Sequence, residues 1–237
     1  MTGRRLYPVT IDDLKRLHGF SWIDVKVTDE GLPDPRPESR KVVRTGTNFL
    51  TEIGKEEDAG VRKWYVEKLL KDCSEVMKAN RETMGIVKPT DLEMELYEID
   101  PKKNPLNDAE QTNLSAWGVI FDEDRERAKR EYANKQFELR FRFKCGPRCQ
   151  NERGHSMKVL DIEAFMLFKH VSERDSDLST IFAKMKAKID DEFNRNDVYF
   201  VLGTHSRYPF VSYMIGTMIR IKKGIVATEP LLIPEAL

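Results

Sequence analysis

One eight-residue stretch, FELRFRFK at residues 137–144, constrains the fold of this 237-residue chain more than any other. Apolar and charged side chains alternate at every position, and successive side chains point to opposite faces in a β-strand. Three Phe and one Leu share one face, while the opposite face carries Arg140, Arg142 and Lys144 beside Glu138. The stretch therefore predicts a strand with one buried face and one basic face.

The chain as a whole predicts an α+β fold with mixed or antiparallel sheets and packed helices. After the alternating strand the pattern indicates a Cys/His loop, helices over 156–171 and 178–193, and a β-hairpin with strands at 198–204 and 210–222. Strands do not alternate regularly with helices, so a doubly wound parallel sheet is not expected.

The first half of the chain is less sharply patterned. It predicts helices at residues 11–20 and 60–80 and strands at 22–27 and 41–53. A short strand before the turn at Pro89 and an alternating strand through Leu92, Met94 and Leu96 are also expected. Cys73 falls on the apolar side of the second of these helices, and we expect it to pack in a core as a small hydrophobic residue. A further helix, almost wholly polar, is expected at 122–135.

Periodicity stops at residues 101–113, where Pro, Asn and Asp cluster. This loop predicts an N-terminal α+β part over 1–105 and a C-terminal α+β part over 106–237. The alternative is one continuous domain, because a chain of this length can bury either one substantial core or two small ones.

Composition limits the partners and the compartment. The chain has 40 basic and 40 acidic residues, so global charge favours no polyanionic partner and only a local patch can do so. No apolar run reaches 18 residues and the N-terminus lacks an apolar signal core, so we expect no membrane association. Three cysteines are too few for a disulfide framework, which predicts a cytoplasmic, reducing location.

Two of these cysteines and a histidine predict a metal site. Cys145 and Cys149 bracket the turn-forming pair Gly146-Pro147, and His155 follows six residues after the second cysteine. Cysteine pairs two to four residues apart are common in zinc sites, because a tight turn aims both sulfurs at one ion. We therefore expect Zn²⁺ bound by these three side chains; reduced thiols in an ordinary loop are the alternative.

The fourth ligand is left open by the sequence. His170 lies fifteen residues beyond the candidate histidine, and Asp161 is nearer. Four protein ligands would make the site structural, whereas three ligands and a water would make it catalytic.

A basic surface surrounds the predicted metal loop. Residues 135–158 include seven basic and two acidic side chains, a net charge of +5. We expect the phosphates of DNA or RNA to be contacted there by the basic residues of the strand and the loop, namely Arg140, Arg142, Lys144, Arg148 and Arg153. His205 and Arg207, in the polar loop of the hairpin, are candidates for further phosphate contacts. The alternative is a solvated face partly neutralised by the acidic residues of 122–135.

The leading hypothesis is thus a nucleic-acid-binding protein with a structural zinc site beside a basic strand. The first alternative is a metal-dependent nuclease or hydrolase, in which Asp161 and Glu163 hold Mg²⁺ or the zinc is open. On a helix, however, positions i and i+2 point about 200° apart, and such acids more often complement the helix dipole. The second alternative is a protein-interaction subunit that uses the ionic helix at 122–135 and the apolar tail at 229–237.

Overall fold

The computed structural model describes residues 4–7, 20–31, 35–44, 49–98, 137–175, 177–205 and 208–230. The predicted helices at 11–20 (apart from Phe20) and 122–135 lie outside the described residues, as do Arg207 and residues 231–237 of the predicted tail. Within the described part, no helix is both long and apolar enough to cross a bilayer.

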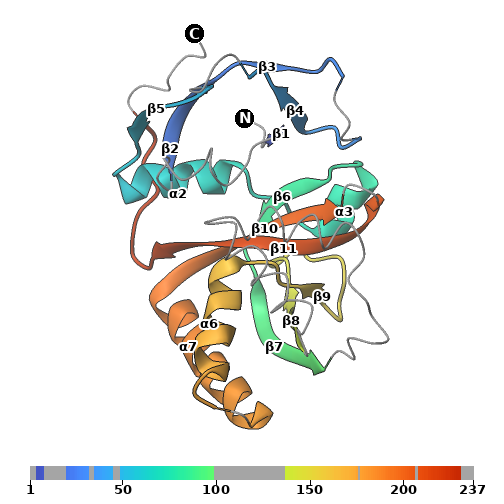
Figure 1. Ribbon diagram of the computed structural model, residues 1–237, viewed down its shortest axis with the longest axis vertical. Coiled ribbons are helices and arrows are strands. Elements are labelled where there is room, and N and C mark those ends of the chain that lie inside the picture. The colour runs from blue at the N-terminus through green and yellow to red at the C-terminus, as the bar shows by residue number, and fades with distance from the viewer. Residues whose placement is uncertain are drawn as a thin grey trace.

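A long antiparallel hairpin runs through the middle of the molecule (Figure 1). It consists of β10 (Asn196–His205) and β11 (Tyr208–Lys222), and β6 (Met84–Val87) pairs antiparallel with the other edge of β10. The hairpin predicted from the two apolar runs is confirmed. In Figure 1 the helices α6 (Ile162–Ser172) and α7 (Leu178–Arg195) lie on one side of this hairpin, and the N-terminal elements lie on the other.

The alternating stretch is a strand, as predicted, and it lies at the centre of a second antiparallel sheet. β8 (Phe137–Lys144) pairs on one side with β7 (Thr90–Glu98) and on the other with β9 (His155–Lys158). Phe141 and Phe143 are fully buried, whereas Arg142 is exposed, as the alternation requires.

The predicted helix at 156–171 is wrong over its first six residues. Ser156 to Lys158 form part of β9, and α6 begins only at Ile162. Met157 and Val159 are buried while Ser156 is exposed, which is the period of a strand; the buried helix that follows masked this short alternation. Val159 also bridges to Ile215 of β11, so this segment links the two sheets.

One core joins the two sheets and the helices. The ring of Phe200 on β10 stacks on Phe141 at a centroid distance of 5.6 Å and meets Phe143 edge-on at 4.9 Å. From α7 the buried residues are Ile181, Met185 and Ile189, at the helical spacing that predicted this face. The α+β class with antiparallel sheets and packed helices is therefore confirmed.

The N-terminal elements form two small sheets beside α2 (Ala59–Lys68) and α3 (Ser74–Ala79). The strands are β1 (Arg5–Tyr7), β2 (Ser21–Val25), β3 (Val27–Thr28), β4 (Ser39–Val42) and β5 (Leu50–Lys55). One sheet has the order β1-β4-β3, and β2 pairs with β5 in the other.

The single helix predicted over 60–80 is in fact two helices. After α2 the chain leaves the helical path: the N–H of Lys71 donates to the carbonyl of Ile86 at 2.8 Å, and Leu70 forms a bridge to the same residue. Cys73, with extended backbone angles, then begins α3. Each helix buries apolar residues, Val66 of α2 beside Tyr199 and Met77 of α3 in the larger core, so the apolar spacing runs on through the break and the sequence pattern could not reveal it.

The predicted boundary between residues 105 and 106 stays a prediction. Strands from both sides of it share two sheets, since β6 pairs with β10 and β7 pairs with β8.

Candidate metal centre

The loop between β8 and β9 brings the predicted ligands together. Cys145 follows the last residue of β8, and the N–H of Cys149 donates to the carbonyl of Gly146 at 3.1 Å to close the turn. Gly154 has a φ of +72°, and a Cβ there would lie 2.7 Å from the carbonyl oxygen of Phe143. This return turn places His155 in register opposite Phe143, at the start of β9.

Cys73 completes the cluster from a distant part of the chain. Its sulfur lies 3.9 Å from Cys149 Sγ and 3.5 Å from His155 Nε2, and Cys149 Sγ lies 3.3 Å from the same nitrogen. The ligand atoms of Cys73, Cys145, Cys149 and His155 all lie within 4.8 Å of one another. In a tetrahedral site, Zn–S and Zn–N bonds of about 2.3 and 2.0–2.1 Å place the ligand atoms about 3.6–3.8 Å apart. The observed spacing fits such a site.

Burial and hydrogen bonding set the protonation of the thiols. Burial is the largest cause that raises the pKa of Cys145 to about 12, and the nearby Cys73 and Cys149 raise it further. Hydrogen bonds with the backbone and hydroxyl of Ser74 oppose this rise. Burial also opposes ionisation of Cys73, but hydrogen bonds from the backbone of Glu75 and Gln150 and from the neighbouring thiols bring its pKa below the usual value. Three sulfurs this close repel one another as thiolates, and a bound cation removes that penalty.

His155 is buried, and burial lowers its pKa despite the opposing charge of Glu75. Its Nε2 faces the sulfurs of Cys73 and Cys149, whereas its Nδ1 lies 3.9 Å from a carboxylate oxygen of Glu75. Ser74 Oγ is within 3.4 Å of both ring nitrogens. A neutral imidazole whose second nitrogen faces a carboxylate and a hydroxyl is oriented as metal-binding histidines usually are.

The predicted cluster of Cys145, Cys149 and His155 is thus present, and Cys73 is a candidate ligand that the sequence analysis missed. Cys73 was expected to be a core residue, and it is indeed buried. The available signal was its setting in KDCSE, where polar residues flank it on both sides. Neither residue considered as a fourth ligand belongs to the cluster: His170 is exposed on α6 beside Glu173.

Asp161, the other residue considered, caps α6. One oxygen accepts the N–H of Ala164 at 3.0 Å; the other accepts the N–H of Met218 at 2.8 Å and the hydroxyl of Thr217 at 3.1 Å. Glu163 lies exposed on the first turn and pairs with Arg220 at 2.5 Å. The two carboxylates therefore contact different residues of β11, and their predicted catalytic role stays a prediction.

The basic strand face is interleaved with carboxylates from other segments. Each basic residue from 140 to 148 lies within 3.1 Å of an acidic oxygen; the pairs are Arg140–Glu138, Arg142–Glu95, Lys144–Asp91 and Arg148–Asp72. Arg153 is exposed on the loop, and His205 is half-buried at the end of β10. The net charge of +5 counted over residues 135–158 did not include three of these four carboxylates, because they come from residues 72 to 95.

The four clustered side chains all lie within the part of the chain that matches a known family. No curated protein and no solved structure matches the chain. The profile of one family, described as Domain of unknown function (DUF8757), matches residues 63–230. Since the match spans well over half of the sequence, the chain belongs to the DUF8757 family.

Proposed function

We propose that Cys73, Cys145, Cys149 and His155 hold one structural Zn²⁺ ion, and that the chain is a zinc-stabilised binding module. The single observation that carries this proposal is the closed set of three sulfurs and one imidazole within 4.8 Å. Structural zinc sites typically have four protein ligands, whereas catalytic sites keep one position for water or substrate. Thiolate and imidazole ligands in a tetrahedral arrangement also favour zinc over magnesium or calcium.

A metal at this position would join two segments that are distant in the sequence. Cys73 lies at the start of α3, and the other three ligands belong to the loop between β8 and β9 and its return. Only Cys149 of the four is partly exposed, so solvent has access from one side. A structural role for the ion follows from this burial.

Metal analysis of two histidine variants tests the proposal. We expect about one zinc per chain in the purified protein, and a cobalt-substituted protein should show the absorption of thiolate-to-metal charge transfer. His155→Ala should lose most of the zinc. The matched control is His170→Ala, which removes an exposed imidazole outside the cluster and should leave the zinc content unchanged. Full zinc occupancy in His155→Ala, or a metal-free native protein, would contradict the proposal.

A second candidate function is the contact of nucleic-acid phosphates by the outer face of β8 and the metal loop. It is favoured by the side chains of Arg142 and Arg148, which are 52% and 79% exposed, although each lies beside a carboxylate. Glu95 remains ionised: burial opposes this, but hydrogen bonds from Ser156 and Tyr97 and the charge of Arg142 lower its pKa. A phosphate must therefore displace a carboxylate at each arginine.

This displacement gives the second candidate a distinctive test. Arg142→Gln should weaken binding to mixed DNA or RNA and reduce its salt dependence by about one phosphate contact. Glu95→Gln should tighten binding, because it frees the guanidinium 2.6 Å away. Fluorescence anisotropy at several salt concentrations measures both effects. If Glu95→Gln binds no better than the unmodified protein, this face is not the nucleic-acid surface.

A further inference from the structure

A cleft of about 740 Å³ lies on the side of β6 that faces the N-terminal strands. Its walls come from the segment after α2, the turn after α3 and β6, all within the family match, and from Arg4 and residues 35–38, which precede it. Cavities of this size, where separate parts of a chain meet, are the usual place for ligands. The cleft shares no residue with the metal cluster.

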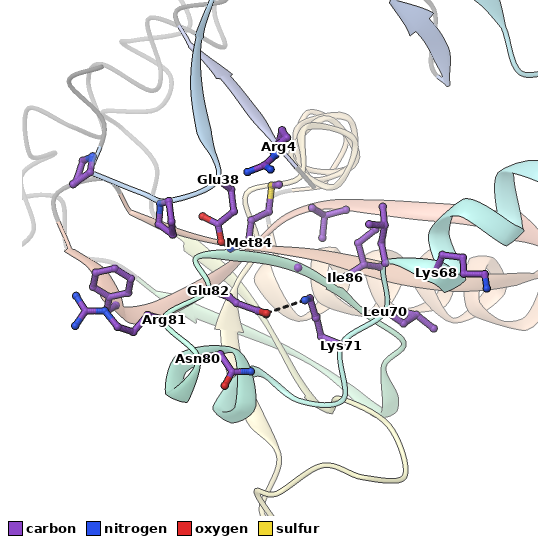
Figure 2. Close-up of a pocket in the computed structure, with 16 residues that line it drawn as sticks. Arg4, Glu38, Lys68, Leu70, Lys71, Asn80, Arg81, Glu82, Met84 and Ile86 are labelled. Carbon is purple, nitrogen blue, oxygen red and sulfur yellow. Dashed lines mark hydrogen bonds and ion pairs between the residues drawn. The ribbon is translucent and has the colours of Figure 1, made fainter. Parts of the chain in front are cut away.

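The ionic side chains of this cleft are not balanced. Its cations are Arg4, Lys68, Lys71 and Arg81, and its anions are Glu38 and Glu82. Both carboxylates are engaged: Glu82 pairs with Lys71 at 2.9 Å, as Figure 2 shows. Glu38 accepts hydrogen bonds from the backbone of Thr83 and Met84.

Three of the four cations have no acidic partner in the part of the chain that the structure describes. Among the described residues, no carboxylate forms an ion pair with Arg4, Lys68 or Arg81. Lys68 is the last residue of α2 and Arg81 follows the end of α3, where a cation interacts favourably with the helix dipole, but Arg4 comes from a separate segment. The basic face of β8 differs, because each of its cations from residue 140 to 148 has a carboxylate within 3.1 Å.

Arg81 occupies a backbone position that favours glycine. Its φ is +56°, and it follows α3 in a turn closed by two hydrogen bonds. Arg81 N–H donates to the carbonyl of Lys78, and Glu82 N–H donates to that of Met77. Glycine is the usual residue at this position, because a side chain there costs about 1 kcal/mol. The guanidinium lies 4.6 Å from the ring centroid of Phe210, another residue that lines the cleft. An arginine kept at a strained position beside a cavity points to a ligand.

We propose that this cleft binds the phosphate groups of nucleotides, as free nucleotides or within a single strand. Figure 2 places Arg81 and Lys68 at opposite ends of the cleft, with Ile86 and Leu70 between them. Cations separated by apolar surface suit a ligand whose phosphates are separated by sugars and bases. This proposal does not depend on the zinc site or on the face of β8.

Replacing Arg81 by the residue its backbone favours separates binding from folding. Arg81→Gly removes the cation and relieves the positive φ, so its melting temperature should equal or exceed that of the unmodified protein. Binding of ATP and of fluorescein-labelled oligo-dT or oligo-U should weaken about tenfold or more. For the single strands, the slope of log affinity against log salt should fall by about 0.7 for the lost contact. The matched control is Arg195→Gln, which removes an exposed arginine paired with Asp191 on α7, outside the cleft, and should leave binding of these probes unchanged.

Calorimetry with ATP and anisotropy with the oligonucleotides, at about 50 and 200 mM salt, distinguish the two ligand sources. Binding of ATP that competes with the oligonucleotide assigns the cleft to nucleotides in general, and binding of the oligonucleotide alone assigns it to single strands. The proposal is wrong if neither probe binds at low salt. It is equally wrong if Arg81→Gly binds as tightly as the unmodified protein, or if Arg195→Gln weakens binding as much.

Discussion

Removal of the metal by a chelator is expected to lower the melting temperature of this protein by about 8–16 °C. The fall corresponds to a loss of about 4 kcal/mol, with each kcal/mol worth about 2–4 °C in a chain of this size. The physical reason is that three sulfurs and an imidazole, buried or half-buried together, lose the ion that neutralises them. Metal-free zinc fingers unfold outright, but here the sheet and helix core remains, so we expect a destabilised fold.

Differential scanning fluorimetry with and without chelator measures this effect, and Cys73→Ser provides the control. That variant lacks a ligand and should melt low in both conditions, so added chelator should change nothing further. A chelator that strips the zinc from the unmodified protein but leaves its melting temperature unchanged would show that the ion is not structural.

Asp161→Ala is expected to cost about 2–4 kcal/mol of folding free energy. The substitution removes the cap of α6, worth about 1 kcal/mol, and leaves the buried N–H of Met218 without its acceptor, at a cost of about 1–3 kcal/mol. Asp161→Asn retains only one of the two carboxylate oxygens as an acceptor, so its free energy of unfolding should lie between those of Asp161→Ala and the unmodified protein. Chemical denaturation monitored by circular dichroism gives the free energies.

Glu163→Gln is the matched control, because it removes a carboxylate two residues away that is exposed. Its pair with Arg220 is a surface ion pair, and the loss should be within about 0.5 kcal/mol. A metal-dependent nuclease that uses both acids predicts the opposite pattern: each variant abolishes cleavage, and neither changes stability much. Equal stability of Asp161→Ala and Glu163→Gln would therefore contradict the capping role.

The features that the sequence predicted correctly are those set by residues close together in the chain. The strand at 137–144 and the hairpin were predictable because alternation over many residues has one geometric solution. The trio Cys145, Cys149 and His155 was predictable because a Gly-containing loop of eleven residues can bring its own members together.

The missed features all depend on contacts between distant segments. The break that frees Cys73 exists because the backbone of Lys71 bonds to Ile86, and no periodicity reports such a bond. The neutralisation of Arg142 and Arg148 depends on Glu95 and Asp72, which precede them in the chain by dozens of residues. Sequence counting describes charge along the chain, whereas binding depends on charge in space.

The uneven spacing of the four ligands bears on the order in which the fold assembles. Cys145, Cys149 and His155 are neighbours in sequence, whereas Cys73 and Cys149 are 76 residues apart. Closing so long a loop costs entropy that rises only slowly with length, but the cost falls entirely on the last ligand to arrive. In the proposed zinc site, the neighbouring trio would capture the ion while the chain is still open. The arrival of α3 with Cys73 would then expel the remaining water from the ion and join the early part of the chain to the late part.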